Sequence, residues 1–301
     1  MLNVLKYFKF WFAISAFMFI VSLAAIFTYG LKLGIDFKGG TLTQVSFGGS
    51  APASTEVKDV LNQAGYTDAV VQQAGDNQMI IRTQPQEKEE HDKLLKVLSD
   101  KYGTVNEEQF TSIGPVIGKE LASNAVYQLV LISLGIIFYI AYAFRKVTRP
   151  VTAWRFGWAA IVALLHDLVI VFGVFAVLGH FYNVEIDSLF VTALLTVLGF
   201  SVHDTIVVFD RIRENLRLRA GQSLAEIINS SISQTIVRSI NTSLTVVFVL
   251  VALLLFGGES IRYFVVALLV GIVAGTYSSI FIASPLLLMW YNWDMSRKAR
   301  A

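Results

Sequence analysis

Six long stretches of apolar residues constrain the fold of this chain more than any other feature. A helix needs about 20 mostly apolar residues to cross about 30 Å of hydrocarbon, because each residue rises about 1.5 Å. The stretches that meet this requirement are residues 10–29, 124–144, 158–178, 189–209, 237–256 and 263–290. Only 15% of residues are charged, against about 25% in a typical soluble domain. The sequence therefore predicts an α-helical polytopic membrane protein with six transmembrane helices.

Composition also excludes several classes of function. The chain has no cysteine, so disulfides, thiolate metal sites and thiol catalysis are excluded. The formal net charge is only +2, which gives no reason to expect a nucleic-acid partner.

Positively charged residues gather in alternate connections between the apolar stretches. They are Lys6 and Lys9; Arg145, Lys146, Arg149 and Arg155; Arg211, Arg213, Arg217, Arg219 and Arg238; and Arg297, Lys298 and Arg300. By the positive-inside rule these segments are cytoplasmic, so we expect both termini in the cytoplasm and residues 30–123 outside it. The first stretch is longer than the apolar core of a cleaved signal peptide, so we expect it to be retained as an anchor.

The apolar stretches divide the chain into four parts. Residues 1–29 contain the N-terminus and the first transmembrane helix, and residues 30–123 have the mixed polar composition of a small extracytoplasmic domain. Residues 124–293 form a five-helix transmembrane bundle, and residues 294–301 form a cytoplasmic tail.

Periodicity predicts the elements of the extracytoplasmic domain. Strands are expected at residues 41–47, 69–73, 78–83 and 107–113, with amphipathic helices at 55–64 and 87–102. This order, βαββαβ, is typical of an α+β ferredoxin-like fold with two helices on one face of an antiparallel sheet.

Ionisable residues interrupt three of the apolar stretches. Asp167 lies about 12 Å, and Asp204 about 8 Å, from the cytoplasmic end of its helix, on neighbouring antiparallel helices. Arg238 begins the fifth helix from the same side, and it shares one face with Asn241, Thr242 and Thr245. A charge at the bilayer centre costs at least about 2.5 kcal/mol. We therefore expect a buried polar seam, which either carries protons or only holds the helices together.

Two other chemical interpretations of these residues are weaker. Ser201, His203 and Asp204 are residue types of a hydrolase triad, but they diverge around one helix and cannot relay a proton. The pairs His166–Asp167 and His203–Asp204 supply metal-ligand types, yet adjacent residues point about 100° apart on a helix. We expect no enzyme activity, no metal and no cofactor.

Small residues form a stripe along the sixth apolar stretch. They recur at every fourth position, at Ala267, Gly271, Gly275, Ser279 and Ala283. Such stripes allow close helix packing, either within the chain or against a second subunit. Pro285 follows the stripe, and we expect it to kink the helix.

Several motifs together resemble the SecF family of protein-export membrane subunits, within the resistance-nodulation-division superfamily. Gly34 to Gly40 reads Gly-Ile-Asp-Phe-Lys-Gly-Gly, with Gly34, Asp36, Gly39 and Gly40 as the motif positions. The third helix carries Leu-His-Asp at residues 165–167. The fourth ends in the long motif of residues 201–215, which includes Asp210 and Arg211, and residues 238–243 open the fifth. His203 departs from the family pattern, which commonly has Asn before the membrane aspartate.

The resemblance implies an auxiliary subunit of the Sec translocase in the bacterial cytoplasmic membrane. It would work with SecD, the SecYEG channel and YajC on translocating preproteins, and would use proton influx to drive late steps of export. The proton relay implied by the family is Asp204 with Arg238, and depth and pairing add Asp167, His203 and His166. The alternatives are half of a proton-driven small-molecule exporter and a purely structural assembly factor.

Overall fold

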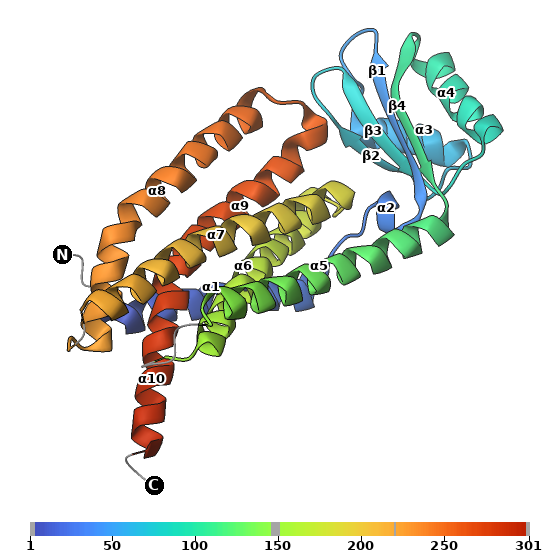
Figure 1. The fold of residues 1–301 in the computed structure, drawn as a ribbon. Coiled ribbons are helices and arrows are strands. Elements are labelled where there is room, and N and C mark those ends of the chain that lie inside the picture. The colour runs from blue at the N-terminus through green and yellow to red at the C-terminus, as the bar shows by residue number, and fades with distance from the viewer. Residues whose placement is uncertain (1–3, 146–150, 220, 299–301) are drawn as a thin grey trace. The chain divides into compact units, whose positions relative to one another are not determined.

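The computed structural model describes residues 4–145, 151–219 and 221–298. Lys146, Arg149, Arg300 and the side chain of Lys298, which contribute to the predicted orientation, lie outside this description. The chain divides into two compact units (Figure 1). The membrane unit comprises Met1–Lys32, Gln128–Val184 and Leu189–Ala301, and the sheet unit comprises Leu33–Tyr127 with the loop Glu185–Ser188.

Six helices in the described residues are long and apolar enough to cross a membrane, as the sequence predicted. They are α1 (Phe8–Tyr29), α5 (Pro115–Ala143), α6 (Ala153–Tyr182), α7 (Ser188–Leu218), α8 (Leu224–Phe256), and α9 (Arg262–Ser278) continuing into α10 (Ser284–Lys298). A short 3-10 turn, Val4–Tyr7, precedes α1, and another, Glu259–Ile261, precedes α9.

Several helices extend beyond the apolar stretches that predicted them. Helix α7 runs to Leu218, with Asp210 in its interior, where it forms an ion pair with Arg213 one turn later. Asp210 therefore lies inside the helix and does not cap its end. Helix α8 begins at Leu224, where Ser223 and Glu226 form a capping box. Hydropathy marks only the apolar part of a helix, whereas caps and polar turns determine its ends.

The last membrane helix is interrupted just before Pro285, in agreement with the sequence. Residues Ser279–Ala283 form a π-helical turn between α9 and α10, and the Ser284 hydroxyl donates to the Ser279 carbonyl oxygen at 3.2 Å. Proline has no N–H to continue the α-helical hydrogen bonds, so a change of helical register at this point is expected.

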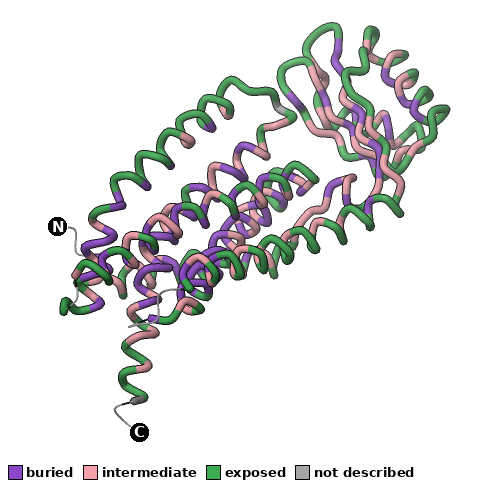
Figure 2. Tube along the Cα trace, in the orientation of Figure 1, coloured by how far each residue is buried: buried purple, intermediate pink, exposed green. Residues whose placement is uncertain are grey.

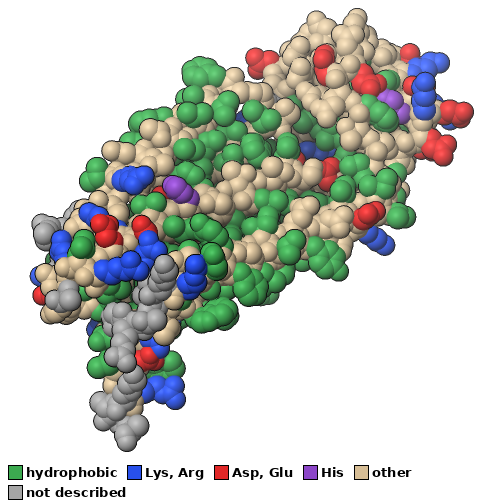
Figure 3. Space-filling model, viewed as in Figure 1, with side chains coloured by type: hydrophobic (Ala, Val, Ile, Leu, Met, Phe, Trp, Pro, Cys, Tyr) green, Lys and Arg blue, Asp and Glu red, His purple; other side chains and the backbone are tan. Residues whose placement is uncertain are grey.

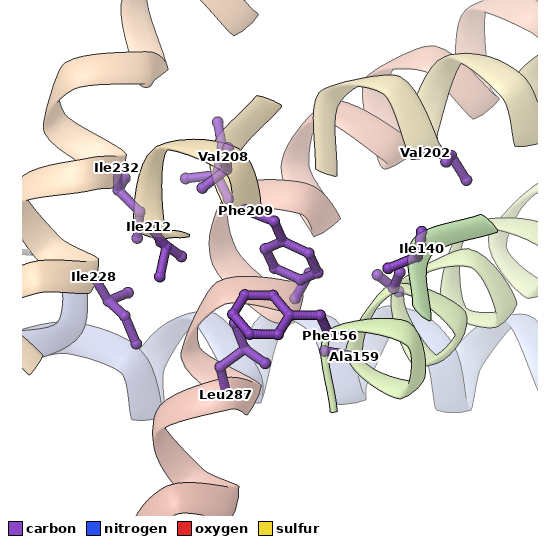
Figure 4. Packing of buried hydrophobic residues seen from close by; sticks show 14 of the residues in the cluster. Ile140, Phe156, Ala159, Val202, Val208, Phe209, Ile212, Ile228, Ile232 and Leu287 are labelled. Atoms are coloured by element: carbon purple, nitrogen blue, oxygen red, sulfur yellow. The ribbon is translucent and has the colours of Figure 1, made fainter. Parts of the chain in front are cut away.

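Aromatic rings form the centre of the membrane unit. Phe156 stacks on Phe144 at 5.0 Å between centroids and meets Phe209 edge to face at 5.1 Å. Leu287 lies beside the rings of Phe156 and Phe209 in the same cluster (Figure 4). Helices α6 and α7 and the α9–α10 helix have half or more of their apolar windows buried, whereas α1, α5 and α8 are mostly exposed (Figure 2).

The small-residue stripe packs inside the membrane unit. A Cβ atom at Gly271 would lie 2.3 Å from a γ carbon of Val197, and one at Gly275 would lie 2.8 Å from Cβ of Ser201. Both partners are on α7, and Ala267, Ser279 and Ala283 are fully buried. The stripe therefore joins α9 to α7, and its use as a contact with a second subunit is wrong because no part of it remains accessible.

The sheet unit has the predicted ferredoxin-like arrangement. Its strands are β1 (Gly40–Phe47), β2 (Val70–Gln73), β3 (Gln78–Thr83) and β4 (Val105–Ile113), in the antiparallel order β2-β3-β1-β4. Helices α3 (Ser54–Gln63) and α4 (Lys88–Tyr102) cover one face (Figure 1). Val57 and Leu61 of α3 and Leu94 and Leu98 of α4 meet the buried side chains of β1 and β3 there. A short helix that the sequence did not predict, α2 (Ile35–Lys38), precedes β1.

Candidate functional site: a polar seam in the membrane unit

Asp167 on α6 is a buried ionisable residue with several side-chain hydrogen bonds. Its side chain is 1% exposed. The hydroxyls of Ser201 on α7 and Ser278 on α9 donate to Oδ2 at 2.8 Å and 2.7 Å, and His166 Nδ1 lies 3.1 Å from Oδ1. Hydroxyls from α7 and α9 thus both donate to one carboxyl group on α6, which stabilises that group inside an apolar bundle.

His166 extends this cluster toward α1. Its ring is nearly parallel to those of Phe19 and Tyr277, with centroids 6.3 Å and 6.5 Å away. The Tyr277 hydroxyl donates to the Trp11 carbonyl oxygen at 2.8 Å and accepts from Ser15 at 3.2 Å. His166 Nε2 is buried and has no hydrogen-bond partner within the described part of the chain.

Asp204 on α7 has a looser environment. The residue is 2% exposed and is surrounded by the hydroxyls of Ser239 and Ser243 on α8 and Thr276 on α9. The Ser243 hydroxyl is 3.5 Å from Asp204 Oδ2, whereas it is 2.5 Å from the Thr276 hydroxyl. Ser239 Oγ is buried without a hydrogen bond to any described residue. Asp204 is therefore enclosed by donors that do not hold it tightly.

The structure does not bring Arg238 to Asp204. Arg238 is exposed on α8 and lines a cleft of about 450 Å³ together with Asp210, Arg211 and Glu214 of α7. In that cleft Arg211 donates to Glu214 at 2.5 Å and to Gln234 of α8 at 2.6 Å. Asn241, Thr242 and Thr245 are also exposed in the single chain. The seam exists as expected, but α8 contributes Ser239 and Ser243 to it and not the face that begins with Arg238.

The two His-Asp pairs do not converge. His203 is exposed on α7 while Asp204 beside it is buried, and Ser201 donates to Asp167 and not to His203. Among the described residues no group of three or more His, Asp or Glu side chains is placed to hold a metal ion. The arrangement suits proton binding or helix packing.

Sequence reasoning missed the hydroxyl groups that complete the seam. Thr276 and Ser278 come from α9, and Ser239 and Ser243 are spaced one helical turn apart on α8. That spacing was visible in the sequence. The carboxyl groups that these hydroxyls approach could not be predicted, because one sequence does not give the rotation and height of each helix relative to its neighbours.

The motif segment at residues 34–40 lies in the sheet unit. Asp36 Oδ2 accepts from the backbone N–H of Ser188 at 2.8 Å and from the Ser188 hydroxyl. Ser188 is the first residue of α7.

Two protein-family models match this chain. The model described as protein export membrane protein SecD/SecF, C-terminal, matches residues 93–293, which is more than half of the chain, and the SecD/SecF GG motif model matches residues 24–51. A protein translocase subunit SecF from Thermobaculum terrenum is 48% identical, over 99% of this chain and 96% of the relative. A SecF subunit from Anaerolinea thermophila is 43% identical, over 98% of this chain and 96% of the relative.

Solved structures agree in fold. The crystal structure of SecDF from Thermus thermophilus, described as a translocon-associated membrane protein, superposes with a TM-score of 0.85 at 33% identity and covers 97% of this chain. A structure of SecDF in a super-membrane-facing form gives a TM-score of 0.71 at 31% identity, over 99% of this chain. This chain spans only 39% and 40% of those two SecDF chains.

Proposed function

Because the chain belongs to the SecF family of protein translocase subunits, we propose that it works with SecD to couple proton influx to late steps of protein export. It is a multi-pass membrane protein. The observation that carries the proposal is the presence of two buried carboxyl groups, Asp167 and Asp204, inside its helix bundle. Ionisable residues within membrane helices are costly and commonly mark ion or proton pathways.

Asp204 is the group that takes up and releases the proton in this proposal. Its surrounding hydroxyls are not committed to short bonds with it, so a change in protonation does not require a tight network to be broken. Arg238 precedes Ser239 on α8. A shift of α8 against α7 would therefore replace the hydroxyl neighbours of Asp204 with the guanidinium group of Arg238. Opposite charge favours the ionised carboxyl group, so the two arrangements would bind the proton with different affinity.

The energy available from a proton is sufficient for such a switch. One charge crossing 100 mV yields about 2.3 kcal/mol, which changes a two-state equilibrium by about 50-fold. Asp167 is held by two short hydroxyl bonds, and this favours a structural role for that residue. His166 next to it, with a buried unpartnered nitrogen, is the second candidate for a proton carrier, and His203 remains a weaker one.

SecD is the proposed partner in the membrane. Helix α8 exposes Arg238, Asn241, Thr242 and Thr245 in the single chain, and polar side chains are poorly accommodated by lipid. Transporters of this superfamily use two related halves, and this chain corresponds to about two fifths of the SecDF chains it resembles. We infer that a second helix bundle covers this face. The SecYEG channel, YajC and the preprotein are partners by family membership alone.

The proposed orientation places both termini and the basic helix ends in the cytoplasm. Lys and Arg side chains gather at one end of the membrane unit (Figure 3). Arg213 of α7 lies against the end of α5, with its guanidinium 5.6 Å from the Phe144 ring centroid. The loop Glu185–Ser188 would then lie on the extracytoplasmic side, with the sheet unit to which it belongs.

The test is protein export in proteoliposomes that contain the SecYEG channel, SecD and this chain, with and without an imposed proton gradient. Asp204→Asn should keep SecD association and lose the gradient-dependent part of export. Asp59→Asn is the control, because Asp59 is an exposed aspartate outside the motifs and the seam. If Asp204→Asn retained gradient stimulation, the proton relay would be rejected and a structural assembly role favoured. A small-molecule exporter would instead show solute transport without SecYEG.

A further inference from the structure

The motif at the end of α7 makes a buried polar contact that the proton relay does not use. Asn215, its last residue, is 2% exposed, and its Nδ2 donates to Ser231 Oγ at 2.8 Å and to Gln234 Oε1 at 3.1 Å. Ser231 is fully buried on α8 and donates in turn to the Ile227 carbonyl oxygen at 2.7 Å. Both donors of one amide nitrogen on α7 are therefore used by side chains of α8.

Two arginines extend this contact. Arg211 lies one turn before Asn215, and Arg219, just past the end of α7, lies one turn after it. Arg211 Nε donates to the same Gln234 oxygen at 2.6 Å, and Arg219 donates to Ser230 Oγ at 2.9 Å. Gln234 Nε2 also donates to Ser230, at 3.3 Å. We call the six residues of this network the α7–α8 clasp: Arg211, Asn215, Arg219, Ser230, Ser231 and Gln234.

The clasp and the hydroxyls around Asp204 lie at matching distances along two antiparallel helices (Figure 1). On α7, Asn215 is eleven residues from Asp204, which is about 16.5 Å along the helix axis. On α8, Ser231 is twelve residues from Ser243, which is about 18 Å. The two lengths differ by much less than one turn of about 5.4 Å. A hydrogen bond between Asn215 and Ser231 therefore brings Ser243 to the height of Asp204.

Apolar contacts alone do not select this height. Ile212 of α7 packs in one cluster with Ile228 and Ile232 of α8 (Figure 4). Ile228 and Ile232 are one turn apart, so a slip of α8 by one turn would offer Ile212 a similar surface. A buried amide differs, because a slip leaves its donors without acceptors in an apolar medium. Single buried asparagines fix the register of paired helices in this way.

We propose that Asn215 is a positioning residue that sets the register of α8 on α7 and so determines which α8 hydroxyls face Asp204. Sliding of α8 by one turn breaks both hydrogen bonds of the Asn215 amide, whereas a tilt of α8 about the clasp keeps them. The clasp thus restricts the movement of α8 that proton coupling requires. The consequence for export rests on the proposed function, whereas the register itself does not.

Crosslinking reports the register without reference to export. The purified full-length chain has no cysteine, so Asp204→Cys can be paired with one cysteine on α8 at a time. Four α8 positions, about one turn apart, are used: Thr235, Ser239, Ser243 and Val247.

The two inner positions, Ser239 and Ser243, should react with a short thiol-reactive crosslinker about tenfold faster than the two outer ones, since a slip that unpairs a buried amide carries about that factor. Asn215→Leu should abolish most of this difference. Asn292→Leu, at an exposed site on α10, is the control and should preserve it. An unchanged difference in Asn215→Leu would show that the connection between the helices sets the register, and would overturn the proposal.

Variants on the facing helix keep the test decisive if Asn215→Leu does not fold. Gln234→Met removes the second acceptor at similar volume, so it should also reduce the difference between inner and outer positions. Exchange of the partners, Asn215→Ser with Ser231→Asn, rebuilds a hydrogen bond at the same height and should recover that difference. If these variants changed only the yield of folded protein and never the crosslinking pattern, the clasp would be merely structural and the proposal would be overturned.

Export in the SecYEG and SecD proteoliposomes, measured in parallel, keeps the two proposals distinguishable. Asn215→Leu should lose the gradient-dependent part of export, and the partner-exchange variant should regain it. If Asp204→Asn still responded to the gradient while Asn215→Leu changed the crosslinking pattern, the proton relay would fail and the register would stand. If the pattern did not change, the register proposal would fail whatever the export result.

Discussion

Gly271→Ala should destabilise the membrane unit although alanine is the better helix former. The added Cβ would lie 2.3 Å and 2.7 Å from the two γ carbons of Val197 and 3.0 Å from its Cβ. Rotation about χ1 cannot clear three carbons at once, so α9 and α7 must separate. Overpacking of this kind costs about 1–3 kcal/mol, and helix propensity returns at most about 1 kcal/mol. We expect a net loss of about 1–2 kcal/mol.

A mutant cycle with Val197→Ala tests the cause. Removing the γ carbons should leave space for the new methyl group. The double variant should therefore lose about 1–2 kcal/mol less free energy of unfolding than the sum of the losses in the two single variants. Gly199→Ala is the control on α7, the helix of Val197, since a Cβ at Gly199 would meet no atom within 4 Å. It should be neutral or slightly stabilising.

The assay is unfolding in detergent followed by tryptophan fluorescence. The five tryptophans, at residues 11, 154, 158, 290 and 293, all belong to the membrane unit, so the signal reports on that unit alone. Additive single effects, or a Gly271→Ala variant as stable as Gly199→Ala, would refute the close packing of α9 on α7.

Two further predictions concern the seam and the sheet unit. Ser278→Ala removes a donor 2.7 Å from Asp167 and should lower the stability of the membrane unit by about 1 kcal/mol in the same fluorescence assay. Ser296→Ala, at an exposed site, should leave that stability unchanged. Leu94→Ala removes a fully buried side chain from the sheet-unit core and should lower the stability of that unit by about 2–5 kcal/mol. Val70→Ala, at a 40% exposed position, is the control, and limited proteolysis of the sheet unit measures both variants.

The sheet unit could be predicted almost residue by residue. The strand predicted at 78–83 is β3 at the same residues, and the helix predicted at 87–102 is α4 with one residue fewer. Glycines and turn residues mark the ends of these elements, and alternation reveals which face of each strand is buried. Helix α2 was missed because its four residues are too few for helical periodicity.

The membrane site could be predicted only in part, for a reason that is specific to helix bundles. Hydropathy identified the helices and their ionisable residues, so Asp167 and Asp204 were found. The sequence did not show which face of α8 turns inward. Arg238 and Asn241 on one face are as visible in the sequence as Ser239 and Ser243 on the other. The small-residue stripe was equally visible, but its partner Val197 depends on the relative height of α9 and α7.

The two buried aspartates differ in a way that composition does not reveal. Asp167 receives two short hydroxyl bonds, one of them from Ser278, the last residue before the π-helical turn. The hydroxyls around Asp204 are engaged differently: Ser243 lies 3.5 Å from its Oδ2, Thr276 bonds to Ser243 and to the Ile272 carbonyl oxygen, and Ser239 has no partner among the described residues. A tightly bonded carboxyl group fixes the positions of the helices that supply its donors, because moving any one of them leaves a polar group unpaired in an apolar medium. A loosely bonded one can exchange neighbours at lower cost. The seam therefore combines a fixed point at α6, α7 and α9 with an adjustable point where α8 meets α7, and α8 is the helix whose movement the proposed proton coupling requires.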